Sequence, residues 1–242
     1  MKPADSFQTV IFDCDSTLSS IEGIEELARE HRAEVEALTE EAMRGEIPLE
    51  QVYGRRLELV RPPRGRVLAL GRRYIETLVP DAVETVAALR AEGVHVRVIS
   101  GGLKPAVVAL AKALGLEENV VAAVDIFFSD DGSYAGFETD SPLAATGGKR
   151  RVIESWAVPR PSLMVGDGAT DQEAQPAVDA FAAFAGVVYR APVVAAADYV
   201  IRERSLAPVL PLALGGRRPT TAASQAIFDR GLRLLGPNYS RT

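Results

Sequence analysis

The stretch "TVIFDCDST" (residues 9–17) places an unbroken apolar run directly before two aspartates. The run at 9–12 has the length and composition of a buried strand. Asp13 and Asp15 follow one residue apart, and residues at i and i+2 of an extended segment point the same way. Two carboxylates facing one site would repel each other unless a cation neutralises them. The stretch therefore predicts a strand that ends at a charged site.

Further apolar runs of this kind indicate a sheet. They occur at 94–99, 162–165, 180–184 and 199–201. Helical patterns separate most of them, notably at 81–92, 104–114 and 148–156. Buried strands that alternate with helices are typical of a parallel sheet covered on both faces. We therefore expect an α/β fold with a doubly wound, mainly parallel sheet, whose chemistry lies beyond the carboxyl ends of the strands.

The chain between the first two predicted strands has a different pattern. It is dense in Glu, Ala, Leu and Arg, and helical patterns run over 21–31, 34–44, 49–60 and 66–78. This predicts a small helical bundle inserted into the α/β domain. A second, smaller insertion is indicated at 125–139, where β-rich runs flank Asp131-Gly132 as in a hairpin.

The predicted domain boundaries follow from these patterns. Residues 1–19 and 79–205 form the α/β core, 20–78 the helical insertion, and 206–242 a C-terminal extension. Within the extension, 214–224 has the composition of a linker and 225–235 that of a short amphipathic helix. This helix is either a packed tail or a self-association element, so a homodimer stays open.

Composition limits the compartment and the partners. The chain has 242 residues and a net charge of −6, which provides no field that would gather nucleic acid. Its single cysteine, Cys14, rules out an internal disulfide and fits a reducing compartment. The N-terminus lacks a signal-peptide pattern, and the longest apolar run, 180–189, is too short to span a bilayer. We expect a cytoplasmic protein without nucleic-acid or membrane partners.

Polar groups stand at each further strand end or helix start. They are Ser100-Gly101-Gly102, Lys149 after a glycine pair, and Asp167 and Asp171 within "GDGATD" (166–171). Taken singly, an aspartate after a strand is more often a turn former or helix N-cap, and a lone lysine is usually solvated. Together with the pair Asp13 and Asp15, these make four such groups, and four in this order are harder to explain as turns and caps.

Together these groups form a chemical set. The carboxylates of Asp13, Asp15 and Asp167, with Asp171 nearby, are hard oxygen donors of the kind that suits Mg²⁺. The hydroxyl of Ser100, the amides of Gly101 and Gly102, and the ammonium of Lys149 offer the donors that a phosphate requires. One carboxylate is free to attack and another to move protons. The set predicts phosphoryl transfer through an aspartyl phosphate.

These motifs resemble the haloacid dehalogenase superfamily of phosphohydrolases, whose four motifs match "DCDST", "SGG", Lys149 and "GDGATD". Within it, the chain is most similar to the phosphoserine phosphatases. The stretches that carry this likeness are "FDCDSTLSSIEGIEELA" (12–28), "GEIPLEQVYGRRLEL" (45–59), "GSYAGFET" (132–139) and "GDGATDQEAQPAVDAFAAF" (166–184). The resemblance covers roughly residues 8 to 202 and implies a Rossmann-like core with an inserted cap.

The resemblance also implies roles at the strand ends. Asp13 would be the nucleophile, and Asp15 the acid and base that serves the serine oxygen and then water. Mg²⁺ would be held by Asp13, the main-chain carbonyl of Asp15, Asp167 and Asp171. Ser100, Gly101, Gly102 and Lys149 would hold the phosphoryl group.

Other implied roles concern the substrate. Glu22 matches the family's acceptor for the serine ammonium, Arg56 its partner for the serine carboxylate, and Met43 lines the same pocket. Thr170 and Arg190 match positions near the substrate in the animal-type enzymes. The family usually has Phe where this chain has Leu49 and Leu103, which concerns substrate choice rather than reaction type.

The expected activity is therefore Mg²⁺-dependent hydrolysis of O-phosphoserine, the last step of serine biosynthesis. A first alternative is the same chemistry on another small phosphomonoester. A second is a receiver-type signalling domain phosphorylated on Asp13, against which the inserted cap and Asp15 argue. A dinucleotide-binding module is disfavoured because the glycine spacing GxGxxG is absent.

Overall fold

The computed structural model describes residues 6–31, 33–35, 37–38 and 49–236. Its centre is a six-stranded sheet in the order β3-β2-β1-β6-β7-β8, and all neighbouring strands are parallel. The strands are β1 (Thr9–Phe12), β2 (His95–Leu103), β3 (Val121–Val124), β6 (Ser162–Gly166), β7 (Ala180–Phe184) and β8 (Tyr199–Ile201). The predicted doubly wound, mainly parallel α/β fold is confirmed.

Two details of the sheet differ from the prediction. Strand β3 was not predicted, because "VAAV" is short and half alanine. Strand β2 runs on to Leu103, with an irregular register against β3 after Ile99. The Ser-Gly-Gly motif therefore lies in the last part of a strand rather than in the turn after it.

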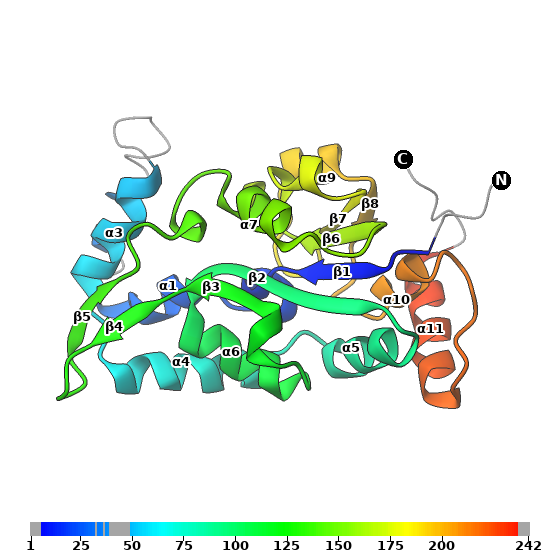
Figure 1. The fold of residues 1–242 in the computed structure, drawn as a ribbon, viewed down its shortest axis with the longest axis horizontal. Helices are drawn as coiled ribbons and strands as arrows, with labels where there is room; N and C mark the ends of the chain where they lie inside the picture. Colours follow the sequence, from blue (N-terminus) through cyan, green and yellow to red (C-terminus); the bar gives the residue numbers. More distant parts are fainter. Residues whose placement is uncertain (1–5, 32, 36, 39–48, 237–242) are drawn as a thin grey trace.

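Helices cover both faces of the sheet (Figure 1). Helices α5 (Ala82–Ala91) and α6 (Lys104–Ala113) lie on one face, and α7 (Gly148–Trp156) and α9 (Ala191–Ala196) on the other. Side chains of β1 alternate between two apolar clusters: Val10 and Phe12 join the larger one, and Ile11 the smaller. This alternation follows from the period of a strand and gives each face its own core.

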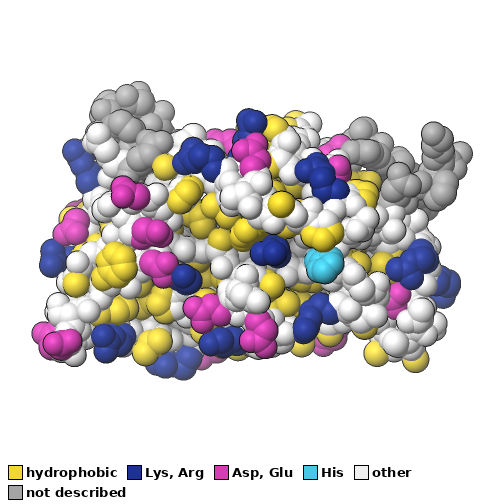
Figure 2. All heavy atoms as spheres, viewed as in Figure 1, with side chains coloured by type: hydrophobic (Ala, Val, Ile, Leu, Met, Phe, Trp, Pro, Cys, Tyr) yellow, Lys and Arg dark blue, Asp and Glu magenta, His cyan; other side chains and the backbone are white. Residues whose placement is uncertain are grey.

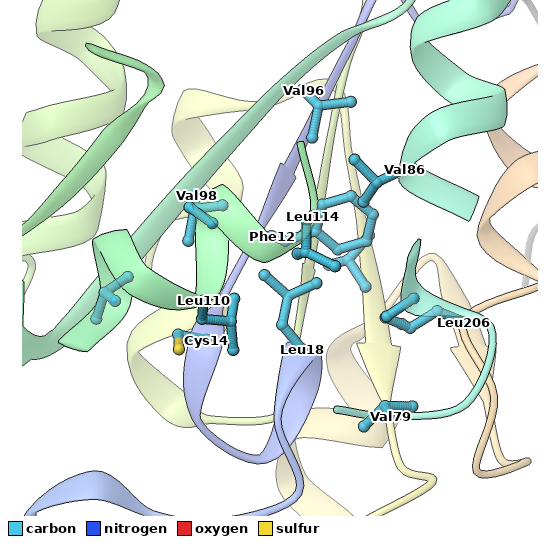
Figure 3. Packing of buried hydrophobic residues seen from close by; sticks show 14 of the residues in the cluster. Phe12, Cys14, Leu18, Val79, Val86, Val96, Val98, Leu110, Leu114 and Leu206 are labelled. Carbon is cyan, nitrogen blue, oxygen red and sulfur yellow. The ribbon is translucent and has the colours of Figure 1, made fainter. Parts of the chain in front are cut away.

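The larger cluster lies directly beneath the end of β1. Figure 3 shows Cys14 and Leu18, which follow β1, packed near Leu110 of helix α6. Cys14 is fully buried, and burial followed by the neighbouring Asp15 raises the pKa of its thiol well above the usual value. The thiol therefore acts as a packed apolar group.

The inserted segment is helical in the part of the chain that the structure describes. It contains α1 (Gly23–Leu27), a 3₁₀ turn (Arg29–His31), α3 (Leu49–Val60) and α4 (Arg64–Glu76). Helix α4 packs closely on core helix α6, because a Cβ on Gly71 would come within 2.9 Å of the Cβ of Ala109. The predicted helix at 34–44 and Met43 fall largely or wholly outside the described residues.

The predicted hairpin is present as β4 (Ile126–Phe128) and β5 (Tyr134–Phe137), a separate antiparallel pair. It reaches across to the inserted helices: the amide of Arg64 donates to the carbonyl of Gly132 at 2.9 Å. The rings of Phe137 and Tyr53 lie 5.3 Å apart. The hairpin therefore contacts both α3 and α4 of the first insertion, and it lies below α3 in the view of Figure 1.

The C-terminal segment packs on the core. Helix α10 (Val209–Ala213) is wholly buried, and α11 (Ala222–Leu235) lies against α5. Leu206 lies near Val79 in Figure 3, and its amide donates to the carbonyl of Pro80 at 3.0 Å. Of the two readings of the amphipathic helix, the structure shows the packed tail, so the predicted boundary at 206 marks no break in packing.

The remaining surface carries mixed charges. On the face shown in Figure 2, basic and acidic side chains are interspersed over most elements. Among the described residues, no helix combines the length and the apolar character that crossing a membrane requires.

Candidate active site

The carboxyl ends of β1, β2 and β6 border a cavity of about 350 Å³ that the inserted helices cover. Both parts of the chain line it, with Asp13, Asp15, Gly101, Gly102, Lys149 and Thr170 from the core and Glu22, Val52, Tyr53 and Arg56 from the insertion. Ser100, Asp167 and Asp171 are buried beside the cavity rather than lining it. The structure thus brings together every predicted site residue that it describes.

We call the core side of the cavity its floor, which comprises Asp13, Asp15, Gly101, Gly102 and Lys149, with the buried Ser100, Asp167 and Asp171 beside it. Lys149 connects two of its carboxylates. Its Nζ lies 2.5 Å from Oδ1 of Asp13 and 2.6 Å from Oδ1 of Asp171. Burial by itself lowers the pKa of Lys149, but the charges of Asp13 and Asp171 outweigh this effect and hold that pKa above its usual value. Lys149 is therefore a permanent cation between two carboxylates.

A close backbone contact determines where Lys149 stands. Helix α7 begins at Gly148, and a Cβ there would lie only 1.7 Å from the carbonyl oxygen of Pro142. Only glycine fits beside the short 3₁₀ turn Pro142–Ala144. The glycine before the lysine is thus explained by packing, and it places Lys149 in the first turn of α7.

Three buried aspartates form an acidic cluster around the end of β1. Asp13, Asp167 and Asp171 each offer a carboxylate oxygen, and these atoms all lie within 4.8 Å of one another. Burial, followed by the charge of Asp171, raises the pKa of Asp13 well above its usual value, against the opposing effect of Lys149. Burial and Asp171 likewise raise the pKa of Asp167 to about 6. The cluster has an excess of negative charge that a cation would relieve.

The donor set of this cluster fits a hard divalent cation. All three side chains are carboxylates, and they come from the ends of two adjacent strands and the short helix α8 (Ala169–Gln172). Carboxylate oxygens are the ligands that Mg²⁺ prefers. The carboxylate of Asp15 is not part of this cluster.

Asp15 has partners of a different kind. Its Oδ1 accepts from the amide of Gly23 and the hydroxyl of Tyr74, both at 2.6 Å, and its Oδ2 accepts from the hydroxyl of Ser100 at 3.1 Å. Asp13 and Asp15 line the same cavity, but among the described residues no side chain is hydrogen-bonded to both carboxylates. A left-handed Ser16 (φ 52°) turns the chain directly after Asp15.

The Ser-Gly-Gly motif is held by hydrogen bonds within itself and to the insertion. The amide of Gly102 donates to Oγ of Ser100 at 2.8 Å, and the hydroxyl of Tyr53 donates to the carbonyl of Gly101 at 2.9 Å. Tyr53 comes from helix α3, so the insertion contacts this end of strand β2 directly. Neither Tyr53 nor Tyr74 was predicted as a site residue, because an aromatic residue in an amphipathic helix usually packs in the core.

The insertion forms the wall of the cavity with Glu22, Val52, Tyr53 and Arg56, and this wall carries charges of both signs. Burial, followed by the charge of Asp15, raises the pKa of Glu22 to about 7, although the hydroxyl of Ser16 donates to it at 2.7 Å. Arg56 is partly buried, and this burial lowers the pKa of its guanidinium against the opposing charges of Glu25 and Glu22. An acidic and a basic side chain therefore line the same cavity as Asp13.

Arg190 links the floor to the wall. Its guanidinium forms a hydrogen-bonded ion pair with Asp167 and lies 3.7 Å from Oε1 of Glu22. Arg190 was predicted near the substrate only from the family resemblance. In the structure it stands at the start of α9, next to both acidic groups.

Comparisons with known proteins agree with this geometry. The model of the haloacid dehalogenase-like hydrolases matches residues 7–178. The chain is 38% identical to phosphoserine phosphatase of Bos taurus over 82% of its length and 90% of the bovine protein, and 37% identical to that of Homo sapiens with the same coverage. A solved structure described as a phospho-aspartyl intermediate analogue of phosphoserine phosphatase is similar with a TM-score of 0.70 and 30% identity, covering 86% of this chain and 99% of that one. The chain belongs to the haloacid dehalogenase-like hydrolases.

Proposed function

We propose that this hydrolase cleaves O-phosphoserine to serine and phosphate through an aspartyl phosphate on Asp13. The observation that carries the proposal is the joint lining of one cavity by Asp13, Glu22 and Arg56. A phosphate at the floor leaves the ammonium and carboxylate of serine facing the wall, where Glu22 and Arg56 complement them. A sugar phosphate offers neither an ammonium for Glu22 nor a carboxylate for Arg56.

The floor residues would act in order. Oδ of Asp13 attacks phosphorus as the bond from phosphorus to the serine oxygen breaks, and Asp15 gives that oxygen a proton. Asp15 then takes a proton from water, whose oxygen attacks the phosphorus and releases phosphate and the free carboxylate of Asp13. Lys149, the hydroxyl of Ser100 and the amides of Gly101 and Gly102 would hold the charged phosphoryl oxygens throughout.

The acidic cluster would hold Mg²⁺, through Asp13, Asp167, Asp171 and the main-chain carbonyl of Asp15. When bound, this ion supplies positive charge that allows a dianionic phosphate to approach buried carboxylates. The proposal is supported by the 4.8 Å grouping of the three carboxylates and by the raised pKa values of Asp13 and Asp167.

The division into domains is part of the proposal. We assign residues 1–19 and 79–205 to the catalytic core and 20–78 to a cap that excludes water from the reaction.

Met43 and Thr170 would complete the substrate pocket, and Thr170 lines the cavity. Residues 206–242 remain a C-terminal extension, whose described part packs on α5. A cytoplasmic role in serine biosynthesis is part of the proposal, in which a homodimer stays open.

Two departures from the family, Leu49 and Leu103, were predicted to concern substrate choice. Leu103 is fully buried in the larger apolar cluster and is not among the residues that line the cavity, so it gives no reason to prefer another substrate. Leu49 begins helix α3, which carries Tyr53 and Arg56 of the wall, so other small phosphomonoesters belong in the test.

A substrate panel tests the proposal. Phosphate release from L-phosphoserine, D-phosphoserine, phosphothreonine, glucose 6-phosphate and glycerol 3-phosphate is measured with Mg²⁺ present. We expect phosphoserine to have a kcat/KM at least about 100-fold above the sugar and glycerol phosphates, since two charged contacts distinguish them. Similar values across the panel would reject phosphoserine as the specific substrate while leaving the reaction type in place. A phosphorylated form that persists for hours without phosphate release would favour a receiver-type domain instead.

A further inference from the structure

The side chain of Tyr74 makes a contact that the reaction described above does not use. Tyr74 lies in helix α4 and is fully buried, and its hydroxyl donates to Oδ1 of Asp15 at 2.6 Å. Burial, followed by the charge of Asp15, raises the pKa of this hydroxyl well above the usual value, so it remains a donor. A buried tyrosine hydroxyl is thus aimed at the carboxylate assigned to proton transfer.

Two glycines make room for this contact. A Cβ on Gly23 would come within 1.9 Å of the Tyr74 hydroxyl, and a Cβ on Gly102 would come within 3.3 Å. Gly23 begins helix α1, whereas Gly102 belongs to the Ser-Gly-Gly motif of the core. Segments that are distant in sequence therefore leave a space that the hydroxyl fills.

The backbone that carries Tyr74 is well supported. Helix α4 packs along core helix α6, with Gly71 close to Ala106 and Ala109. Val67 and Leu70 are buried on the same side of α4. Although α4 belongs to the insertion in sequence, it is held by the core, so Tyr74 approaches Asp15 from a rigid element.

The two oxygens of Asp15 have distinct surroundings. Oδ1 is occupied by the Tyr74 hydroxyl and the Gly23 amide, whereas Oδ2 accepts from Ser100, a residue assigned to phosphate binding. Only Oδ2 therefore lies on the side where a phosphoryl group and its leaving oxygen would stand.

We propose that Tyr74 is a positioning residue for proton transfer, which holds Oδ1 of Asp15 so that Oδ2 meets the leaving-group oxygen. The proposal rests on the function proposed above. In the first step the proton passes from Oδ2 to the serine oxygen as its bond to phosphorus breaks, and the negative charge left on Asp15 is shared with Oδ1, where Tyr74 and Gly23 donate to it.

The test compares leaving groups in Tyr74→Phe, which deletes the hydroxyl and keeps the buried ring. The seryl oxygen is a poor leaving group that needs a proton, whereas p-nitrophenolate departs without one. Since kcat/KM reports only the steps up to the first irreversible one, we expect it to fall about 10- to 100-fold with phosphoserine and less than about threefold with p-nitrophenyl phosphate. The KM for phosphoserine should change less than about twofold.

Two controls keep the outcome interpretable. Asp15→Asn should show the same dependence on the leaving group with a larger loss, which checks the proposed function separately. Tyr134→Phe removes a hydroxyl from another buried tyrosine, in the hairpin and away from the cavity, and should leave both substrates unaffected.

The positioning role would be overturned if Tyr74→Phe lost activity equally on both substrates, or on neither, while Asp15→Asn showed the leaving-group effect. Equal losses would show that the hydroxyl supports the fold, and thermal melting of each variant provides that comparison. If Asp15→Asn itself lacked the effect, the assignment of Asp15 in the proposed function would fail, and the role of Tyr74 with it.

Discussion

The floor and the wall of the cavity balance their charges in different ways. On the floor, Lys149 contacts both Asp13 and Asp171 within 2.6 Å, and every one of these groups is buried. On the wall, Glu22 and Arg56 are only partly buried and line the open cavity. Charges on the floor are therefore shielded from solvent and paired with one another, whereas those on the wall are partly exposed in the cavity.

This difference separates the two tasks of the site. A buried, mutually paired set can stabilise a charged transition state without rearranging, which suits a reaction common to many substrates. A partly exposed pair of opposite sign suits recognition, because a molecule with matching charges can reach both side chains from the cavity. Substitutions of Asp13, Lys149 or Asp171 should therefore affect all substrates alike, and those on the wall should discriminate among them.

Asp13→Asn should have the largest effect. The amide cannot attack phosphorus, so kcat should fall about 10⁴-fold or more on every phosphomonoester tested. Phosphate release measures this loss, and thermal melting checks that the variant folds. Substantial residual turnover would show that another group is the nucleophile and would remove Asp13 from the centre of the floor.

Removal of the metal by a chelator should, like Asp13→Asn, reduce the turnover of every substrate. EDTA should reduce turnover of phosphoserine and p-nitrophenyl phosphate to near background, and excess Mg²⁺ should restore both, because the acidic cluster needs a cation. As a readout independent of activity, Mg²⁺ should raise the melting temperature of the wild type but not of Asp167→Asn. An enzyme indifferent to EDTA would exclude the metal from the mechanism.

Arg56→Ala should discriminate between substrates. Loss of the guanidinium should lower kcat/KM about 100-fold for phosphoserine but only a few-fold for p-nitrophenyl phosphate, which has no carboxylate for it to bind. Arg55→Ala is the matched control, since Arg55 is the adjacent arginine in α3 and does not line this cavity. Equal losses on the two substrates would place Arg56 with the floor.

A smaller effect is expected from the titration of Glu22. Its pKa of about 7 lies above the usual value, so the side chain becomes neutral as the pH falls below 7 and then attracts an ammonium less. The KM for phosphoserine should therefore rise several-fold between pH 7.5 and pH 6, with no such rise for p-nitrophenyl phosphate. Glu22→Gln should remove this pH dependence. A rise that persists in the variant would assign it to another group.

The sequence predicts the floor because each of its residues follows a local pattern. Asp13, Ser100 and Asp167 come at or near the ends of apolar strands, and Lys149 follows a glycine pair at a helix start. Parallel strands bring their carboxyl ends to one edge of a sheet, so the local patterns are enough to place these residues together. The strand that was not predicted, β3, lies at the edge of the sheet and contributes none of them.

Only the tertiary structure determines the wall and its connections to the floor. Glu22 and Arg56 have the appearance of solvated helix charges in the sequence, and Tyr53 and Tyr74 that of core aromatics. Their hydroxyls reach Gly101 and Asp15 because α3 and α4 pack over the ends of β1 and β2, a long-range arrangement that helical periodicity does not encode. The sequence by itself thus determines the reaction through residues placed by backbone regularity, and packing between distant segments determines which side chains surround the substrate and orient Asp15.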